Sequence, residues 1–246
     1  MTRLLVSVQD ADEAQVALDA GADVIDVKDP HGGSLGAPPA STVREVMARM
    51  DGRRPVSVAC GELLEWSALQ HLPVVPGIGY AKFGLAGCAP LQDWPTLWAD
   101  ALECLPARTA SVAVVYADGA KVNAPRPQEV LRHAVTLGCR VVLIDTCDKS
   151  AGCLLEHWSV AELDGVLRDI QSAGLQTAVA GSLEIETLMH VLPLSPDYVA
   201  VRGAVSRPAR TGRINRRLVE QLVRQIRGRS LPPAAEPTSA TRQTLT

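Results

Sequence analysis

The chain has 246 residues, of which 47% are hydrophobic and 21% charged, and its formal net charge at pH 7 is −3. This is the composition of a globular protein with a sizeable core, and the acidic balance argues against a general nucleic-acid binder. No apolar run approaches the ~18 residues that a membrane span needs. The first residues enter a strand-like segment directly, so we expect a cytoplasmic protein without a leader. The six cysteines form no CxxC pair, which favours reduced thiols over a disulfide framework.

Strand-like and helix-like segments alternate along the chain. Continuous apolar runs, typical of parallel strands covered on both faces, predict strands at 3–7, 23–28, 55–60, 79–83, 111–117, 140–145, 176–180 and 197–202. Helical patterns predict helices at 10–20, 40–50, 62–70, 90–105, 126–137, 159–173, 184–190 and 214–228.

This alternation predicts an α/β fold, a (β/α)8 TIM barrel in a single domain over residues 1–229. A doubly wound sheet is the alternative, and it is disfavoured because no glycine-rich dinucleotide turn follows the first strand. Residues 230–246, rich in Pro, Ala, Thr and Ser without periodicity, are expected to form a disordered tail.

Lysine is rare in this sequence. Of 24 basic residues only four are lysine, and the rest are arginine; the four are Lys28, Lys82, Lys121 and Lys149. A primary amine can lose its proton and attack a carbonyl group, whereas a guanidinium cannot. A bias toward arginine explains the excess of Arg but not where lysine remains, so the lysines are the first candidates for chemistry.

Charged side chains stand at the ends of several predicted strands, where a barrel gathers its catalytic groups. They are Asp26 and Lys28 on the second strand, Lys82 on the fourth, and Asp145, followed by Lys149, on the sixth. One such Lys–Asp couple has a plainer interpretation as a structural ion pair, but a second lysine at another strand end favours chemistry. Two cations facing one pocket lower each other's pKa, and burial lowers it further, which makes a lysine nucleophilic near neutral pH.

The last two units predict a phosphate site. Gly181 and Ser182 form a small-residue turn after the seventh strand, and Arg202 and Gly203 follow the eighth. Backbone N–H groups at such helix starts bind phosphate, and barrels commonly carry that site here. The next loop contains three arginines and no acid: Arg207, Arg210 and Arg213. That charge fits an anionic substrate better than a merely solvated loop.

Other features are structural or stay open. The five histidines show no HxH or HExxH spacing, so we expect no metal site. Trp94 and Trp98 share a helical stripe, which indicates core or an interface. Residues 32–36 form either a glycine-rich phosphate turn or a mobile lid, and the roles of Asp118 and Lys121 stay open.

Several segments together resemble one family. They are GADVIDVKDP at 21–30, GSLGA at 33–37, KFGL at 82–85, YAD at 116–118, LIDT at 143–146 with Lys149, AGS at 180–182 and VRGA at 201–204. Along nearly its whole length the chain resembles the (5-formylfuran-3-yl)methyl phosphate synthases of methanofuran biosynthesis. The combination of GADVIDVK with GSLGA is not a general barrel signature. The chain departs from the family pattern around 60–78 and in the loop after the eighth strand.

The resemblance implies a TIM barrel that converts two molecules of glyceraldehyde 3-phosphate into a furan aldehyde phosphate, a lyase reaction in which one phosphate and water are lost. It implies that Lys28 is the Schiff-base lysine and Lys82 the proton-transferring residue. It also implies that Asp26, Asp145 and Lys149 are supporting acid–base and phosphate-contacting groups. We expect no cofactor.

The residues alone predict a Schiff-base lyase or aldolase that acts on a phosphorylated sugar. A class I aldolase and a non-catalytic barrel that binds a phosphorylated metabolite are the alternatives. The expected partner is a small phosphorylated triose, rather than a nucleic acid or a membrane. The oligomeric state, including a homo-oligomer, stays open.

Overall fold

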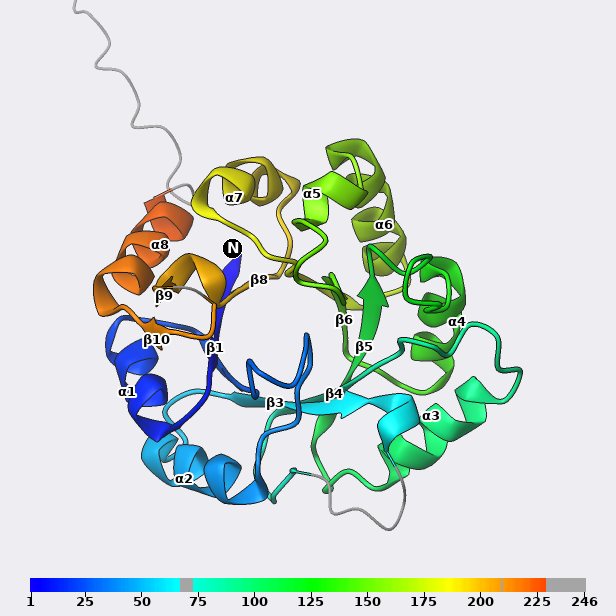
Figure 1. Cartoon of the computed structure of the whole chain (residues 1–246), viewed down its shortest axis with the longest axis horizontal. Coiled ribbons are helices and arrows are strands. Elements are labelled where there is room, and N and C mark those ends of the chain that lie inside the picture. Colours follow the sequence, from blue (N-terminus) through cyan, green and yellow to red (C-terminus); the bar gives the residue numbers. More distant parts are fainter. Residues whose placement is uncertain (67–72, 209, 229–246) are drawn as a thin grey trace, which may run out of the picture.

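The computed structural model describes residues 1–66, 73–208 and 210–228. Its strands form a ring that is surrounded by helices (Figure 1). Eight parallel strands close into a barrel in chain order, with β1 pairing with both β2 and β8. They are β1 (Arg3–Val8), β2 (Val24–Val27), β3 (Val56–Glu62), β4 (Tyr80–Gly84), β5 (Ala110–Tyr116), β6 (Val141–Asp145), β7 (Gln176–Val179) and β8 (Tyr198–Val201). The TIM-barrel prediction is confirmed, and the closed ring excludes the doubly wound sheet.

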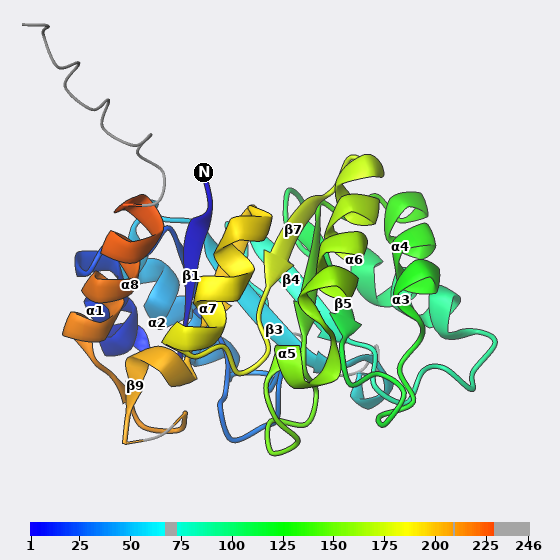
Figure 2. The same cartoon turned by 90° about the horizontal axis from the view of Figure 1, so that it is seen from above.

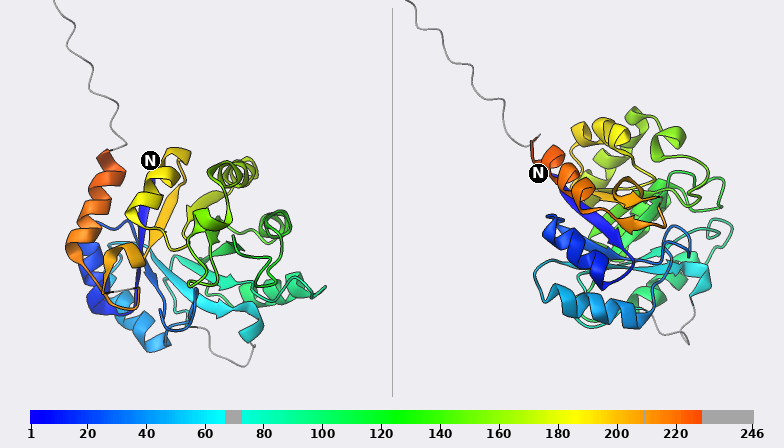
Figure 3. Two further views of the ribbon diagram at one scale, coloured as in Figure 1. Left: turned by 45° about the horizontal axis from the view of Figure 1, so that its top comes forward. Right: turned by 60° about the vertical axis from the view of Figure 1, so that its left-hand side comes forward.

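Helices cover the outside of the ring, as the view from above also shows (Figure 2). They are α1 (Ala11–Asp19), α2 (Ala40–Met50), α3 (Trp94–Glu103), α4 (Pro127–Thr136), α5 (Leu154–His157), α6 (Val160–Ser172), α7 (Ile185–Val191) and α8 (Arg216–Gly228). The views agree that α1 and α8 lie side by side (Figure 3), so the first and last helices cover neighbouring strands. The short helix α5 and the two-stranded hairpin β9 (Ser206–Arg207) and β10 (Arg213–Ile214) were not predicted.

Each strand has apolar residues on both of its faces, and this explains why the sequence predicts the strand bounds accurately. On β1, Leu4, Val6 and Val8 pack outward against the helices, while Leu5 and Ser7 face the barrel interior. Successive side chains of a strand point to opposite faces, and both faces of this sheet are covered. The strand bounds therefore match the predicted ones to within two residues.

One predicted helix, 62–70, is wrong in its described part. Strand β3 continues to Glu62, a single 3-10 turn covers Leu63–Glu65, and Trp66 is extended. The Glu62 carboxylate accepts a hydrogen bond from the Tyr116 hydroxyl at 2.6 Å. Such tertiary contacts override a weak local helical preference. The remainder of the predicted helix lies outside the described residues.

Several smaller expectations can be compared with the structure. Trp94 and Trp98 are buried and stacked, with ring centroids 6.0 Å apart, so they belong to the core. All six cysteines are free thiols, although only Cys60, Cys88 and Cys139 are buried. Within the described residues, no helix combines the length and the apolar character that crossing a membrane requires. The expected tail at 230–246 lies outside the described residues.

Candidate active site

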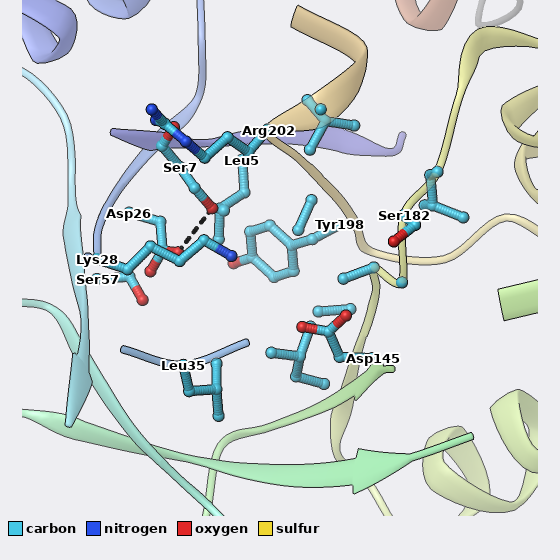
Figure 4. A pocket seen from close by; sticks show the side chains of 18 of the residues that line it. Leu5, Ser7, Asp26, Lys28, Leu35, Ser57, Asp145, Ser182, Tyr198 and Arg202 are labelled. Carbon is cyan, nitrogen blue, oxygen red and sulfur yellow. Dashed lines mark hydrogen bonds between the residues drawn. The ribbon is translucent and has the colours of Figure 1, made fainter. Parts of the chain in front are cut away.

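A cavity of about 420 Å³ lies inside the barrel and reaches the loops that follow the strands. All five charged residues singled out at the predicted strand ends line it: Asp26, Lys28, Lys82, Asp145 and Lys149. Figure 4 shows how the side chains from several strands converge on this space. The barrel thus brings together residues that are up to 123 positions apart in the chain, from β2, β4 and β6 and the loops behind them.

Lys82 and Asp26 form a buried ion pair. The Lys82 ammonium contacts Asp26 Oδ1, and the two side chains are 4% and 3% exposed. The Lys82 ammonium also donates a hydrogen bond to Ser57 Oγ at 3.0 Å. Ser7 Oγ donates a hydrogen bond to Asp26 Oδ2 at 2.9 Å. Since β2, β3 and β4 are consecutive in the ring, Lys82 reaches Asp26 across a single intervening strand. The two serines, which sequence reasoning missed, could have been found from the alternation that points them into the barrel.

Lys28 is the first residue after β2, and its ammonium has a different kind of partner. Its Nζ donates to the backbone carbonyl of Ser34 at 3.2 Å. Among the described residues, no carboxylate lies within ion-pairing distance of this Nζ. The side chain is buried, and its backbone N–H bonds to Val8 O at 3.0 Å, which continues the sheet pairing beyond the strand.

The pKa of Lys28 is lowered to about 7. Burial is the main cause, because it penalises the charged ammonium; the Asp145 carboxylate opposes the shift and the Lys149 ammonium adds to it. A buried amine with such a pKa is partly unprotonated at neutral pH. It can then act as a nucleophile toward a carbonyl carbon.

Asp145 and Lys149 form a second ion pair in the cavity, at the end of β6. Asp145 also accepts hydrogen bonds from the Thr146 backbone at 2.8 Å and from Ser34 Oγ at 3.0 Å. Burial opposes ionisation of Asp145, but the ammonium groups of Lys149 and Lys28 outweigh it and hold the pKa of Asp145 below its usual value. Asp145 is therefore a carboxylate at neutral pH.

Residues 28–36 run from Lys28 across the middle of the barrel mouth (Figure 1). Ser34 and Leu35 are buried, and Ser34 joins two parts of the site: its carbonyl accepts from Lys28, and its hydroxyl donates to Asp145. The turn depends on Gly36, where a Cβ would lie 2.3 Å from Asp29 O. Sequence reasoning singled out this glycine-rich segment but did not find Ser34, whose role depends on the path of the loop.

Arg202 has contacts other than those expected of a phosphate ligand. Its guanidinium forms a buried ion pair with Glu13, with Nη1 at 2.9 Å from Oε2. Its other N–H groups donate to backbone carbonyls of Ser7, Arg210 and Gly212 at 2.8–3.0 Å. Since a guanidinium has five N–H donors, these bonds, together with a longer one of 3.5 Å to Glu13 Oε1, engage all of them. Arg202 thus anchors the loop after β8.

Two small-residue loops border the same cavity at β7 and β8. Gly181 and Ser182 both have positive φ, at 99° and 51°, and both line the cavity, as does Gly203. A side chain at Gly181 would lie 3.0 Å from Leu154 Cβ, so glycine lets this loop pack against α5. These are the loops for which the sequence predicts the phosphate site, which stays a prediction.

The three arginines of the loop after β8 separate into different roles. Arg207 and Arg210 line the cavity, whereas Arg213 contacts Asp10 at the start of α1. Arg210 donates to Pro30 O at 2.9 Å and to Gly33 O at 2.6 Å, so it ties this loop to the segment over the barrel mouth. Arg210 thus adds positive charge beside the lysines.

Asp118 supports the loop after β6. Its carboxylate accepts from the backbone N–H groups of Cys147 and Asp148, both at 2.8 Å. Lys121 is exposed and does not line the cavity. No group of three or more His, Cys, Asp or Glu with the geometry of a metal site occurs among the described residues.

Comparison with solved structures finds other proteins with the same barrel fold. The chain is similar to phosphoribosylanthranilate isomerase from Thermotoga maritima, with a TM-score of 0.57 and 12% identity over 93% of this chain and 100% of that one. It is also similar to 3-hexulose-6-phosphate synthase from Salmonella typhimurium, with a TM-score of 0.54 and 16% identity over 92% and 100%. At these identities the likeness concerns the barrel alone.

Comparison with other sequences is more specific. A protein of Methanosarcina mazei named (5-formylfuran-3-yl)methyl phosphate synthase is 35% identical over 235 residues, covering 90% of this chain and 97% of that protein. One of the same name from Methanococcus maripaludis is 32% identical over 230 residues, covering 90% and 98%. The model of the 4-HFC-P synthase family matches residues 4–223. The chain therefore belongs to the 4-HFC-P synthase family.

Proposed function

We propose that the chain is a Schiff-base synthase that joins two molecules of glyceraldehyde 3-phosphate into (5-formylfuran-3-yl)methyl phosphate. One phosphate and water leave during the reaction, which makes it a lyase, and the product serves methanofuran biosynthesis. The names of the related synthases support the product, and the notable scarcity of lysine outside the cavity supports the chemistry.

The observation that carries the proposal is the environment of Lys28. Its amine is buried, is held by a carbonyl rather than a carboxylate, and has a pKa lowered to about 7 by burial. Attack of the unprotonated amine on a triose carbonyl forms a C–N bond, and the carbonyl oxygen leaves as water to give the imine. The imine then acidifies the neighbouring carbon, which has to lose a proton before a C–C bond can form.

Lys82 and Asp26 are the proposed proton carriers. The pair lies in the same cavity, and the Lys82 ammonium is in direct contact with the Asp26 carboxylate. Such a pair can accept a proton from the substrate and return it at a later step without a net change of charge in the site. Ser7 and Ser57 hold the two side chains in place.

Asp145 and Lys149 are the proposed groups for the dehydration and for contact with the leaving phosphate. Lys149 keeps some exposure to the cavity, with 15% of its side chain accessible. The retained phosphate would bind at the loops of Gly181, Ser182 and Gly203. We assign Arg202 the role of positioning the loop after β8, because the N–H donors of its guanidinium are already engaged.

Borohydride reduction with glyceraldehyde 3-phosphate, followed by peptide mass analysis, tests the proposal. We expect a triose adduct on Lys28 in the wild-type chain, together with release of inorganic phosphate and appearance of the ultraviolet absorption of a furan aldehyde. The Lys121→Arg variant is a matched control, since it removes an amine that does not line the cavity.

The outcomes separate the alternatives. An adduct without phosphate release would indicate a class I aldolase, because aldol addition alone retains both phosphates. The absence of any adduct on Lys28, with substrate still bound, would indicate a barrel that binds a phosphorylated metabolite without this chemistry.

A further inference from the structure

We propose that the deeper half of the cavity is a chamber for the flat furan ring, an inference that rests on the proposed function. This lower chamber lies toward the N-terminal ends of the strands, beneath the lysines. It is lined by Leu5, Val24, Tyr80, Val112, Tyr198 and Ala200. The ring, rather than the triose, is its occupant.

Three of these residues retain accessible surface although they lie on strands of a closed barrel. Leu5, Tyr80 and Ala200 are only partly buried, and all three line the cavity. Barrel interiors are ordinarily filled by layers of packed side chains. Because all three line the cavity, it extends down to this layer of the barrel.

Small side chains on two neighbouring strands create this space. The inward residues Ala178 and Ala180, at β7, and Ala200, on β8, line the cavity. Bulky branched residues are the usual occupants of such positions. The whole cavity, at about 420 Å³, is in the size range of small-molecule sites.

The two halves of the cavity differ in polarity. The upper half has the ammonium and carboxylate groups, whereas the residues that line the lower chamber bear no charge. A triose phosphate would lose hydration of its hydroxyl groups there without obtaining charged partners, which is unfavourable. A furan ring has lost those hydroxyls, so burying it in an apolar chamber is favourable. The chamber thus favours species late in the reaction over the substrates.

The floor of the lower chamber supplies one polar feature. Tyr80 and Tyr198 are the first residues of β4 and β8, and their hydroxyl oxygens lie 3.4 Å apart. Arg3 covers the Tyr198 ring, with its guanidinium carbon 3.8 Å from the ring centroid. One hydroxyl can donate to the other, which leaves the second proton free for a ligand. Burial raises the pKa of Tyr198, so that its hydroxyl keeps its proton at neutral pH.

This floor fits the aldehyde of the product. The phosphomethyl and formyl groups are attached to different ring carbons, so a phosphate held at the mouth leaves the formyl group to point inward. Tyr80 begins β4 two residues before Lys82, which at ~3.3 Å per residue puts it about 7 Å deeper along the strand. A tyrosine hydroxyl can then donate to the formyl oxygen.

Filling the lower chamber tests the proposal. We expect Ala200→Leu to lower furan formation at least about tenfold, while the borohydride adduct of one triose on Lys28 still forms. Ala48→Leu is the matched control, because Ala48 is exposed on α2. Thermal denaturation checks that each variant folds, and Ala200→Val repeats the test with a smaller side chain.

A second measurement is independent of catalysis. We expect (5-formylfuran-3-yl)methyl phosphate to bind the wild-type chain in calorimetry, and to bind Ala200→Leu at least about tenfold more weakly. In the double variant Tyr80→Phe and Tyr198→Phe, we expect about fivefold weaker binding of the product and an unchanged affinity for inorganic phosphate.

The results distinguish the two proposals. If the wild-type chain forms the adduct and the furan, and a folded Ala200→Leu or Ala200→Val does so at the same rate with unchanged affinity for the product, the chamber is refuted and the proposed function stands. If the wild-type chain forms neither adduct nor furan, the proposed function fails. Unaltered product binding by the tyrosine double variant would refute the role of the floor.

Discussion

Lys28 and Lys82 line one cavity, yet their ammonium groups are held in opposite ways. Lys82 stands within β4 and is bound by the Asp26 carboxylate and the Ser57 hydroxyl. Lys28 stands just beyond β2 and is bound by the Ser34 carbonyl, which belongs to the segment over the barrel mouth. One amine is thus part of the rigid sheet, and the other bonds to a loop.

This difference matches the two roles that we propose for the lysines. Separating a buried ion pair is costly, so Lys82 stays beside Asp26. In the proposed mechanism, the pair accepts and returns a proton without either side chain moving away. An amine that attacks a carbonyl has to be unprotonated and has to exchange its hydrogen bond for a covalent bond. In the proposed reaction, the weaker bond to a neutral carbonyl would allow this exchange at Lys28.

The largest expected effect is that of Lys28→Arg. We expect turnover to fall below about one per cent of wild type, because arginine keeps the charge but not the nucleophilic amine. Product formation and borohydride trapping measure the loss, and circular dichroism shows that the fold is intact. Turnover that stayed well above this level would place the covalent bond on another amine.

Removing the amine of Lys82 should separate the two lysines. We expect Lys82→Met to lose about 10²–10⁴-fold in product formation, the range of a general acid–base group, while the adduct on Lys28 still forms. Exchange of the substrate's C2 proton in deuterated water should be lost as well.

Because Lys82→Met leaves Asp26 buried without its cation, the double variant Asp26→Asn and Lys82→Met is the matched control for stability. Normal proton exchange in either folded variant would move the base to Asp145.

The pH dependence of imine formation tests the proposed role of Lys28. Its pKa is lowered to about 7, so the reactive, unprotonated amine increases as pH rises through that value. We expect the rate of imine formation to fall about tenfold per pH unit below about 6 and to reach a plateau above about 8. Single-turnover trapping from pH 5 to 9 measures this dependence. A rate that kept rising toward pH 10 would show that burial does not lower the pKa of the attacking amine.

The smallest expected effect is that of Ser34→Ala. This change keeps the carbonyl that binds Lys28 but removes the hydroxyl that binds Asp145 at 3.0 Å. A hydrogen bond to a charged group contributes about 1.5–3 kcal/mol at most, and water can replace part of it. We expect a several-fold loss of turnover with the imine plateau retained. A loss as large as that of Lys28→Arg would instead assign Ser34 to the reacting groups.

Much of the barrel could be predicted because both faces of its strands are apolar, so that each strand stands out as a run such as VVLID at 141–145. The same pattern makes Asp26, Lys82 and Asp145 conspicuous, because a charge on a buried strand needs a reason. The pairing of these charges was not predictable. Whether Asp26 contacts Lys28 or Lys82 depends on the register of β2, β3 and β4 around the ring.

Arg202 and Ser34 show a second limit of sequence reasoning. An arginine after the last barrel strand is a sound choice for a phosphate ligand, but Glu13 lies 189 residues earlier in the chain and engages it. The contacts of Ser34 with Lys28 and Asp145 depend on the path of its loop across the barrel mouth. Contacts between loops depend on paths that no local pattern encodes. In the described part of the helix expected at 62–70, a long-range contact likewise outweighed the local pattern.

The placement of the four lysines has a practical consequence for amine-directed reagents. Three of them face the cavity, and Lys121 alone is exposed on the surface. Of the four lysines, an acylating label or an amine-coupled surface will therefore modify mainly Lys121 in the folded protein. A protease that cuts after lysine will divide the chain into five pieces, each bounded by one of these residues. Every modification of the three lysines that line the cavity will then appear as a missed cleavage.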